Sequence, residues 1–228
     1  MISVPAAFAR ALGQLADPAV LRILAKSVLL TLLVFVALGV ALYYAMAWML
    51  GAAGISYGDE LGALAAVLAT VIGGWLLFRL VALFVLQFFA EDVVLAVEAR
   101  YYPKQASTAR ELPFAEALRN SLRSTGRALL VNLVALPVAL VLLVTGVGTA
   151  ILFWAVNAWL LGPELQDMVW LRHRTGDEAG APLGKAKRFA LGGAVAALLI
   201  VPFVNLLAPV LGAASATHLV HGRKRTAA

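Results

Sequence analysis

The 228-residue chain contains no cysteine and few charged residues. The absence of cysteine excludes disulfide bonds, thiolate metal sites and cysteine nucleophiles. Charged residues make up 13% of the chain, whereas soluble domains carry about 25%. The sequence also lacks a nucleophile paired with a base, a pair of catalytic carboxylates and a phosphate-binding glycine loop. We therefore expect neither enzymatic activity nor a cofactor, and any ATP-driven step would need another subunit.

What the chain has instead is apolar sequence. Hydrophobic residues make up 63% of it, against roughly 45–50% in soluble domains. Long apolar runs separated by polar loops predict a single all-α integral membrane domain over residues 1–228. The net charge of +6 lies mainly in those loops, which is typical of contact with anionic lipids on the cytoplasmic side. Nucleic-acid binding is disfavoured because the basic residues are spread over several loops.

The first half of the chain predicts two spanning helices. Residues 1–26 form an interfacial segment, with a short amphipathic helix over 4–15 and a helix start at Asp17-Pro18, where Asp favours the N-cap and Pro the first helical position. Residues 27–50 are apolar and long enough to cross a bilayer. The run over 61–90 predicts the second span.

Residues 91–127 are predicted to be a cytoplasmic helical extension followed by an amphipathic helix. Apolar and basic side chains form neighbouring stripes at helical spacing within this segment, which favours a position at the membrane surface. The apolar stripe is Phe114, Leu118 and Leu122, and the basic stripe is Arg119, Arg123 and Arg127.

Two further apolar blocks, 128–161 and 189–221, predict helical hairpins. Each is short for two spans and long for one, because one span needs about 20 apolar residues. The last block breaks around Asn205, which Pro202 and Pro209 bracket, so we expect two short helices that dip into the membrane and return. For the middle block, two full spans and a re-entrant hairpin both remain open.

Basic residues cluster at the N-terminal segment, in both large polar loops and at the C-terminus. Because positive loops stay inside, we expect both termini and both loops in the cytoplasm. The predicted architecture is therefore two long transmembrane helices, two half-penetrating hairpins and cytoplasmic amphipathic helices.

Four segments, in order, resemble a known family. The segments DPAVLRILAKSVLL, FFAEDVVLAVEARYYP, NAWLLGPELQDMVWLRHR and PFVNLLAPVLGAASATHL are similar to the CysZ sulfate permeases and their relatives in the etoposide-induced 2.4-like family. The resemblance covers nearly the whole chain. It implies paired half-penetrating helices, assembly as a homo-oligomer and bacterial sulfate uptake that feeds cysteine biosynthesis.

Candidate anion-binding residues lie at the start of the first long helix. The family carries a Gly-Leu-Arg sulfate-binding motif there, and this chain has Leu21 and Arg22 but Val20 in place of the glycine. Arg22 and Lys26 lie one turn apart near a helix N-terminus, where an oxyanion is favoured. The alternative is that both side chains anchor the helix at lipid head groups.

Several polar residues in or beside apolar segments are candidates for a pore or salt-bridge network. Arg79 carries a charge within a predicted span, so it either faces a cavity or partner, or extends its head group toward one membrane surface. Asparagines in apolar arms either hydrogen-bond between helices or line a path. The resemblance adds carboxylates that would gate that path. The set is Arg79, Glu91, Glu98, Arg100, Asn157 and Asn205.

The three histidines do not have the spacing of a metal site. Only His218 and His221 lie one turn apart, and neither has a carboxylate nearby in the sequence. We expect all three at the membrane interface and no metal.

Together, these features predict a permease or channel for sulfate or a related oxyanion in the bacterial inner membrane. The partners expected are the anion, anionic lipids and further copies of the chain. The alternative is a non-transporting membrane protein that binds lipid or scaffolds partners through half-inserted helices.

Overall fold

The computed structural model describes five stretches of the chain, residues 2–52, 73–74, 89–174, 180–201 and 204–222. Within these stretches the regular structure is helical and contains no strand, which confirms the all-α prediction. The chain divides into two compact units, one formed by residues 22–89 and the other by residues 1–21 and 90–228.

The long helix α2, Pro18–Ala52, begins at the predicted Asp17-Pro18 start. Its first turn is closed by the Leu21 amide, which donates to the Asp17 carbonyl at 2.8 Å. At about 1.5 Å per residue, the helix is roughly 50 Å long, so it contains the predicted span 27–50 with length to spare. The second predicted span, 61–90, lies almost wholly outside the described residues.

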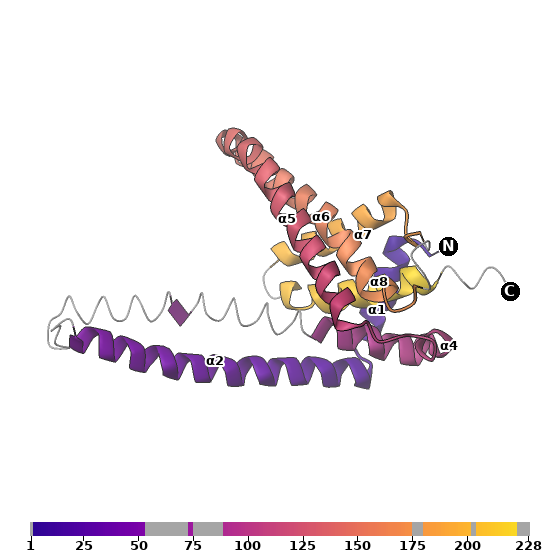
Figure 1. Cartoon of the computed structure of the whole chain (residues 1–228), viewed down its shortest axis with the longest axis horizontal. Helices are drawn as coiled ribbons and strands as arrows, with labels where there is room; N and C mark the ends of the chain where they lie inside the picture. The colour runs from indigo at the N-terminus through magenta and orange to yellow at the C-terminus, as the bar shows by residue number, and fades with distance from the viewer. Residues whose placement is uncertain (1, 53–72, 75–88, 175–179, 202–203, 223–228) are drawn as a thin grey trace. The chain divides into compact units, whose positions relative to one another are not determined.

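Helices α5, Phe114–Leu142, and α6, Val147–Trp170, form an antiparallel hairpin (Figure 1). The short 3-10 helix η1, Leu143–Thr145, and Gly146 make the turn, and Gly146 has a φ of 62°, which suits glycine. The amphipathic helix predicted before residue 128 is continuous with the first apolar arm. Helix α5 therefore crosses the predicted boundary between residues 127 and 128, because no proline or cap separates the basic and apolar parts there.

Helix α6 continues beyond Gly162-Pro163, past the end of the predicted block 128–161. Pro163 removes one intrahelical donor, but the next two turns bury the side chains of Leu165, Gln166 and Val169. This burial holds the helix together as far as Trp170.

Helices α6 and α7, Lys185–Ile200, cross with their backbones in contact. A Cβ atom built on Gly192 would collide with the Ala158 carbonyl oxygen and lie 2.6 Å from the Gly162 nitrogen. A Cβ on Gly162 would collide with the Arg188 carbonyl. Trp154 Nε1 donates to the Gly193 carbonyl at 2.9 Å beside the crossing. Small residues therefore let these two helices approach more closely than side chains normally permit.

The last apolar block breaks where the sequence places its two prolines. Helix α7 ends with Val201 in an extended conformation, the 3-10 helix η2, Val204–Leu206, follows, and helix α8, Ala208–His221, begins directly before Pro209. Apart from Pro209, every residue of α8 is buried. Whether this block and the middle one re-enter the membrane stays a prediction.

Helix α1, Val4–Gln14, packs on α8. Its buried side chains are Ala7, Ala11 and Gln14, whereas Leu12 is 55% exposed. The predicted helix is confirmed, but its buried face is centred on small residues because α8 lies close against them.

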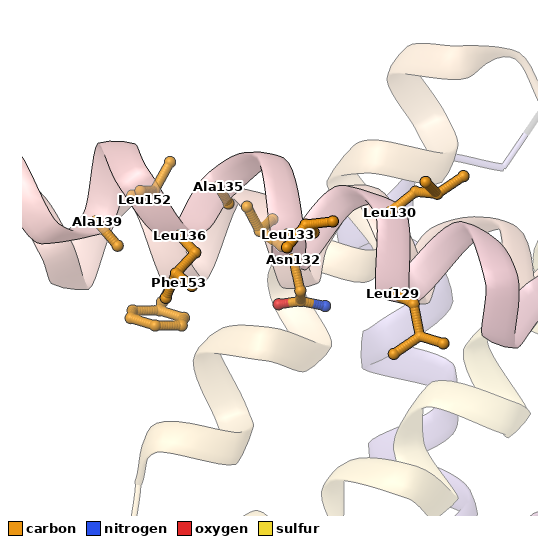
Figure 2. Close-up of a pocket in the computed structure, with 10 residues that line it drawn as sticks. Leu129, Leu130, Asn132, Leu133, Ala135, Leu136, Ala139, Leu152 and Phe153 are labelled. Atoms are coloured by element: carbon orange, nitrogen blue, oxygen red, sulfur yellow. The ribbon is translucent and has the colours of Figure 1, made fainter.

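Two segments, Pro18–Ala45 and Phe114–Thr145, are long and apolar enough to cross a membrane, and their side chains are almost entirely unburied. Figure 2 shows the apolar groove of about 430 Å³ between α5 and α6, lined mainly by leucines, with Asn132 as its polar side chain. Exposed leucine surface of this kind is suited to lipid tails and is typical of a membrane protein.

Candidate functional site

A buried carboxylate marks the centre of the polar site. In the helical segment 89–101, a stripe of fully buried residues runs at helical spacing, and Glu98 continues that stripe with a side chain only 1% exposed. The rest of the stripe is apolar, namely Ala90, Val93, Val94 and Val97. A charge in such a position needs partners, because burying an unpaired carboxylate is costly.

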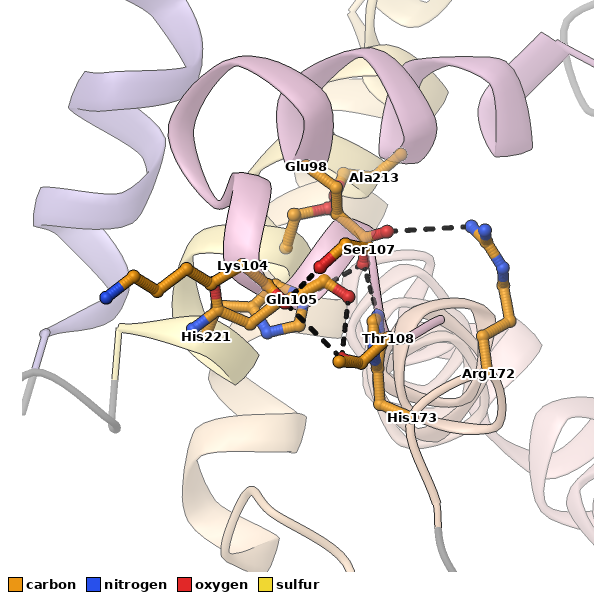
Figure 3. A network of polar contacts seen from close by, with 10 residues as sticks. Glu98, Lys104, Gln105, Ser107, Thr108, Arg172, His173, Ala213 and His221 are labelled. Atoms are coloured by element: carbon orange, nitrogen blue, oxygen red, sulfur yellow. Dashed lines mark hydrogen bonds and ion pairs between the residues drawn. The ribbon is translucent and has the colours of Figure 1, made fainter. Parts of the chain in front are cut away.

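The partners of Glu98 come from two other elements. Its Oε1 atom accepts hydrogen bonds from His173 Nε2 at 2.7 Å and from His221 Nε2 at 2.8 Å. Its Oε2 atom lies 3.7 Å from Arg172 Nη1. Figure 3 shows these side chains converging from the end of α6, the end of α8 and segment 89–101. We call Glu98, Arg172, His173 and His221 the buried carboxylate cluster.

The cluster keeps Glu98 ionised. Burial alone raises the pKa of a carboxyl group. Here the hydrogen bonds from His173 and His221, together with the positive charge the two rings can carry, outweigh burial and lower the pKa of Glu98 to about 2. The carboxylate is therefore negatively charged throughout the physiological pH range.

The third histidine, His218, lies at the centre of a neighbouring chain of hydrogen bonds. His218 Nε2 faces the Gln14 side-chain amide at 2.6 Å, and its Nδ1 faces the Tyr102 hydroxyl at 2.8 Å. Burial, aided by the charges of Arg10 and His221, lowers the pKa of His218 to about 4. His218 is therefore neutral near pH 7 and links α1 to the residue that follows segment 89–101.

A second polar group joins residues 110–116 to the turn after α6. Arg110 binds Glu116 through two hydrogen bonds of 2.9 and 3.0 Å, and Arg174 lies 3.3 Å from the same carboxylate. The Arg110 amide also donates to the Arg172 carbonyl at 2.9 Å. These contacts hold the turn after Trp170, so Arg172 and His173 are presented to Glu98 from a fixed backbone.

His218 and His221 are buried inside the protein, at 1% and 3% exposed, and the expected position of the histidines at the membrane interface stays a prediction. The carboxylate that the sequence seemed to lack is supplied by Glu98, about 120 residues earlier. One local signal was readable, because Glu98 falls on the same helical face as Val94 and next to Val97. An ionisable residue on an otherwise apolar stripe indicates a buried partner.

The predicted anion-binding residues lie along one side of α2. Leu21, Arg22 and Lys26 are all exposed, and the two cations are one helical turn apart. Among the residues that the structure describes, neither Arg22 nor Lys26 has an ion-pair partner. Their positive charges are therefore available to a ligand.

The acidic residue before α2 is already engaged. Asp17 Oδ1 lies 3.3 Å from Arg100 Nη1, and Asp17 Oδ2 accepts a hydrogen bond of 2.8 Å from the Tyr101 hydroxyl. Arg100, predicted for the salt-bridge network, thus forms an ion pair with the carboxylate that precedes α2.

The remaining predicted pore residues are not brought together in the described structure. Arg79 lies outside the described residues. Glu91 is exposed, seven residues before Glu98. Asn157 donates to the Phe153 carbonyl of its own helix at 2.8 Å, and Asn205 lies in η2.

The structure adds a basic groove that sequence spacing did not reveal. Its volume is about 480 Å³, and Arg127, Lys185 and Arg188 supply its positive charges beside Trp159. Arg127 comes from α5, whereas the other two lie in the first turn of α7, so only tertiary packing brings them together. This groove suits a phosphate-bearing head group.

A comparison with protein families gives one match. The family described as "Sulfate transporter CysZ/Etoposide-induced protein 2.4" matches residues 7–209, which is most of the chain and includes all four segments on which the resemblance rested, up to Pro209. No curated protein matches the chain. The family supports a membrane sulfate-transporter type of function at family level.

Proposed function

The chain belongs to the sulfate transporter CysZ/etoposide-induced protein 2.4 family, and from this premise we propose that it is a permease or channel for sulfate or a closely related oxyanion. The observation that carries the proposal is the exposed pair Arg22 and Lys26 on α2, which has no ion-pair partner among the described residues. Two cations one turn apart suit a divalent oxyanion better than a monovalent one.

The proposed anion contact begins at Arg22. Its planar guanidinium can bind two oxygens of a tetrahedral anion at once, and Lys26 adds a point charge one turn along the same helix. The charge of Asp17 is compensated by Arg100, which removes a source of repulsion near the start of α2. Val20, which replaces the family glycine, is buried, so binding here depends on side chains more than on a bare backbone amide.

The proposal also includes how the chain is placed in the membrane. The chain lies in the bacterial inner membrane with both termini in the cytoplasm, its two apolar blocks enter as half-penetrating hairpins, and several copies assemble around the path. The basic groove at Arg127, Lys185 and Arg188 supports contact with anionic lipid head groups on the cytoplasmic side. Anion uptake for sulfur assimilation would follow from this arrangement.

Uptake into vesicles tests the proposal. The purified protein is reconstituted in liposomes, and entry of labelled sulfate is measured against protein-free liposomes. We expect uptake that unlabelled sulfate suppresses, and that Arg22→Gln reduces roughly tenfold or more, because a charge-assisted bidentate contact is lost. Unlabelled sulfite, thiosulfate and phosphate are then added in turn, and the inhibition of labelled sulfate uptake by each ranks the affinities of these oxyanions.

Arg123→Gln is the matched control, since Arg123 is also exposed but lies on the basic stripe of α5. It should leave uptake near the wild-type rate. Uptake no greater than in empty liposomes would refute the permease, whereas normal uptake by Arg22→Gln would refute only the proposed binding site.

The exposed amphipathic start of α5 favours the second candidate function, a lipid-binding or scaffolding protein. Phe114 is 81% exposed, and Leu118 and Leu122 are also exposed, next to the arginine stripe. If sulfate does not enter, co-sedimentation with vesicles containing anionic lipid distinguishes this role. Arg123→Gln would then weaken binding, and Arg22→Gln serves as the comparison.

A further inference from the structure

Three atoms of the kind that bind metal ions converge inside the protein. They are Glu98 Oε1, His173 Nε2 and His221 Nε2, and all lie within 4.8 Å of one another. They come from three elements, segment 89–101, the turn after α6 and the last residue of α8. The three side chains are 1%, 6% and 3% exposed, so the group is an internal site and not a surface coincidence.

The protein's own contacts leave this group incompletely satisfied. Both imidazoles are directed at the same carboxylate oxygen, Oε1. The other oxygen, Oε2, is buried and has no hydrogen-bond partner, and the buried Nη1 of Arg172 also lacks one. Buried polar atoms without partners are uncommon in folded proteins. These two unpaired atoms face each other, whereas the two imidazole nitrogens share the single oxygen Oε1, and the convergence of these three ligand atoms is the feature that suits a metal ion.

We propose that Glu98, His173 and His221 bind a divalent metal ion of the Zn²⁺ type. Two imidazoles and a carboxylate are a donor set that zinc accepts, with bonds of about 2.0–2.2 Å and a fourth position left for water or an anion. Ligand atoms on a tetrahedral zinc lie about 3.3 Å apart. The observed 2.7 and 2.8 Å separations therefore need to open by about half an ångström, and the two histidine nitrogens, which lie within 4.8 Å of each other, need to take up the same spacing.

Arg172 takes a supporting position in this site. With Oε1 on the metal, Oε2 remains facing Arg172 Nη1 at 3.7 Å, and a small approach makes that contact a hydrogen bond. Outer partners of this kind orient a ligating carboxylate. The binding site is independent of the proposed transport function, because none of its residues belongs to the anion contact on α2.

Metal content and cobalt spectroscopy test the site directly. The protein is purified without a histidine tag, stripped with a chelator, dialysed against Zn²⁺ and analysed by inductively coupled plasma mass spectrometry. We expect about one zinc ion per chain and, with Co²⁺ in its place, the visible d–d bands of a four-coordinate ion. Stoichiometry near zero in the wild-type protein would overturn the proposal outright.

Substitutions then assign the ligands. His221→Gln and His173→Gln keep a polar side chain, and each should weaken Zn²⁺ binding roughly tenfold or more, measured by competition with a chromophoric chelator. His218→Gln is the matched control, because His218 lies on the same helix and is equally buried but binds Tyr102 and Gln14 instead. Equal losses in His218→Gln and His221→Gln would refute the assignment.

Folding is checked for each variant by size-exclusion chromatography and circular dichroism. A variant that does not elute like the wild type is set aside. The assignment then rests on the zinc stoichiometry of the wild-type protein and on His173→Gln, whose position lies beyond the end of α6 and outside any helix. Zinc binding that His173→Gln leaves unchanged would overturn the site.

Discussion

Replacing Gly192 by alanine is expected to destabilise the protein by about 3 kcal/mol, the upper end of the range for overpacking. The added methyl group would meet the backbone of α6 at Ala158 and Gly162. Backbone atoms cannot rotate away as a side-chain tip can, so α6 and α7 would have to move apart. Thermal unfolding in detergent, followed by circular dichroism, measures the loss.

Gly126→Ala is the matched control for this prediction. Gly126 lies in α5, and a Cβ there meets no atom within 4 Å. The same chemical change should therefore leave stability unchanged or raise it by up to about 1 kcal/mol, since alanine favours helix over glycine. If both variants melted alike, the close α6–α7 crossing would not be a source of stability.

Glu98→Ala is expected to cost about 3–5 kcal/mol, the range measured when one member of a buried ion pair is removed. The change leaves Arg172 without its counter-charge and takes the acceptor away from His173 and His221. Glu98→Gln should cost less, because its amide oxygen still accepts one hydrogen bond. Unfolding is measured with a chelator present, so that bound metal makes no contribution.

Glu91→Ala is the matched control, because it removes the same negative charge at an exposed position. Glu91 lies two turns before Glu98 in the same helical segment but is exposed, and an exposed substitution usually changes stability by less than about 0.5 kcal/mol. Similar melting temperatures for Glu91→Ala and Glu98→Ala would show that the buried carboxylate cluster does not stabilise the fold.

Local sequence signals were enough to predict the start of α2 and the break in the last block. Asp17-Pro18 and the pair Pro202 and Pro209 act through the backbone of their own segment, so their effect does not depend on distant packing. The family was also identified from sequence, on four segments that lie wholly or mostly within residues 7–209.

Features that depend on neighbours in space were not predictable in the same way. Pro163 resembles a helix end, yet α6 continues because Leu165 and Val169 are buried on other helices. The buried carboxylate cluster joins residues 98, 173 and 221, and no spacing rule links positions that tertiary packing alone unites. The basic groove of Arg127, Lys185 and Arg188 was missed for the same reason.

The burial of nearly all of α8 has a consequence for how the protein is made. This helix follows all the other described helices in chain order, yet it supplies the surface on which α1 packs and carries His218 and His221. During synthesis, Gln14 must therefore wait for His218, 204 residues later, and Glu98 must wait for His173 and His221, 75 and 123 residues later. Until α8 has been made, the nascent chain exposes the Glu98 carboxylate and the alanine face of α1. A protein truncated before residue 208 should therefore be recognised and degraded by quality-control proteases.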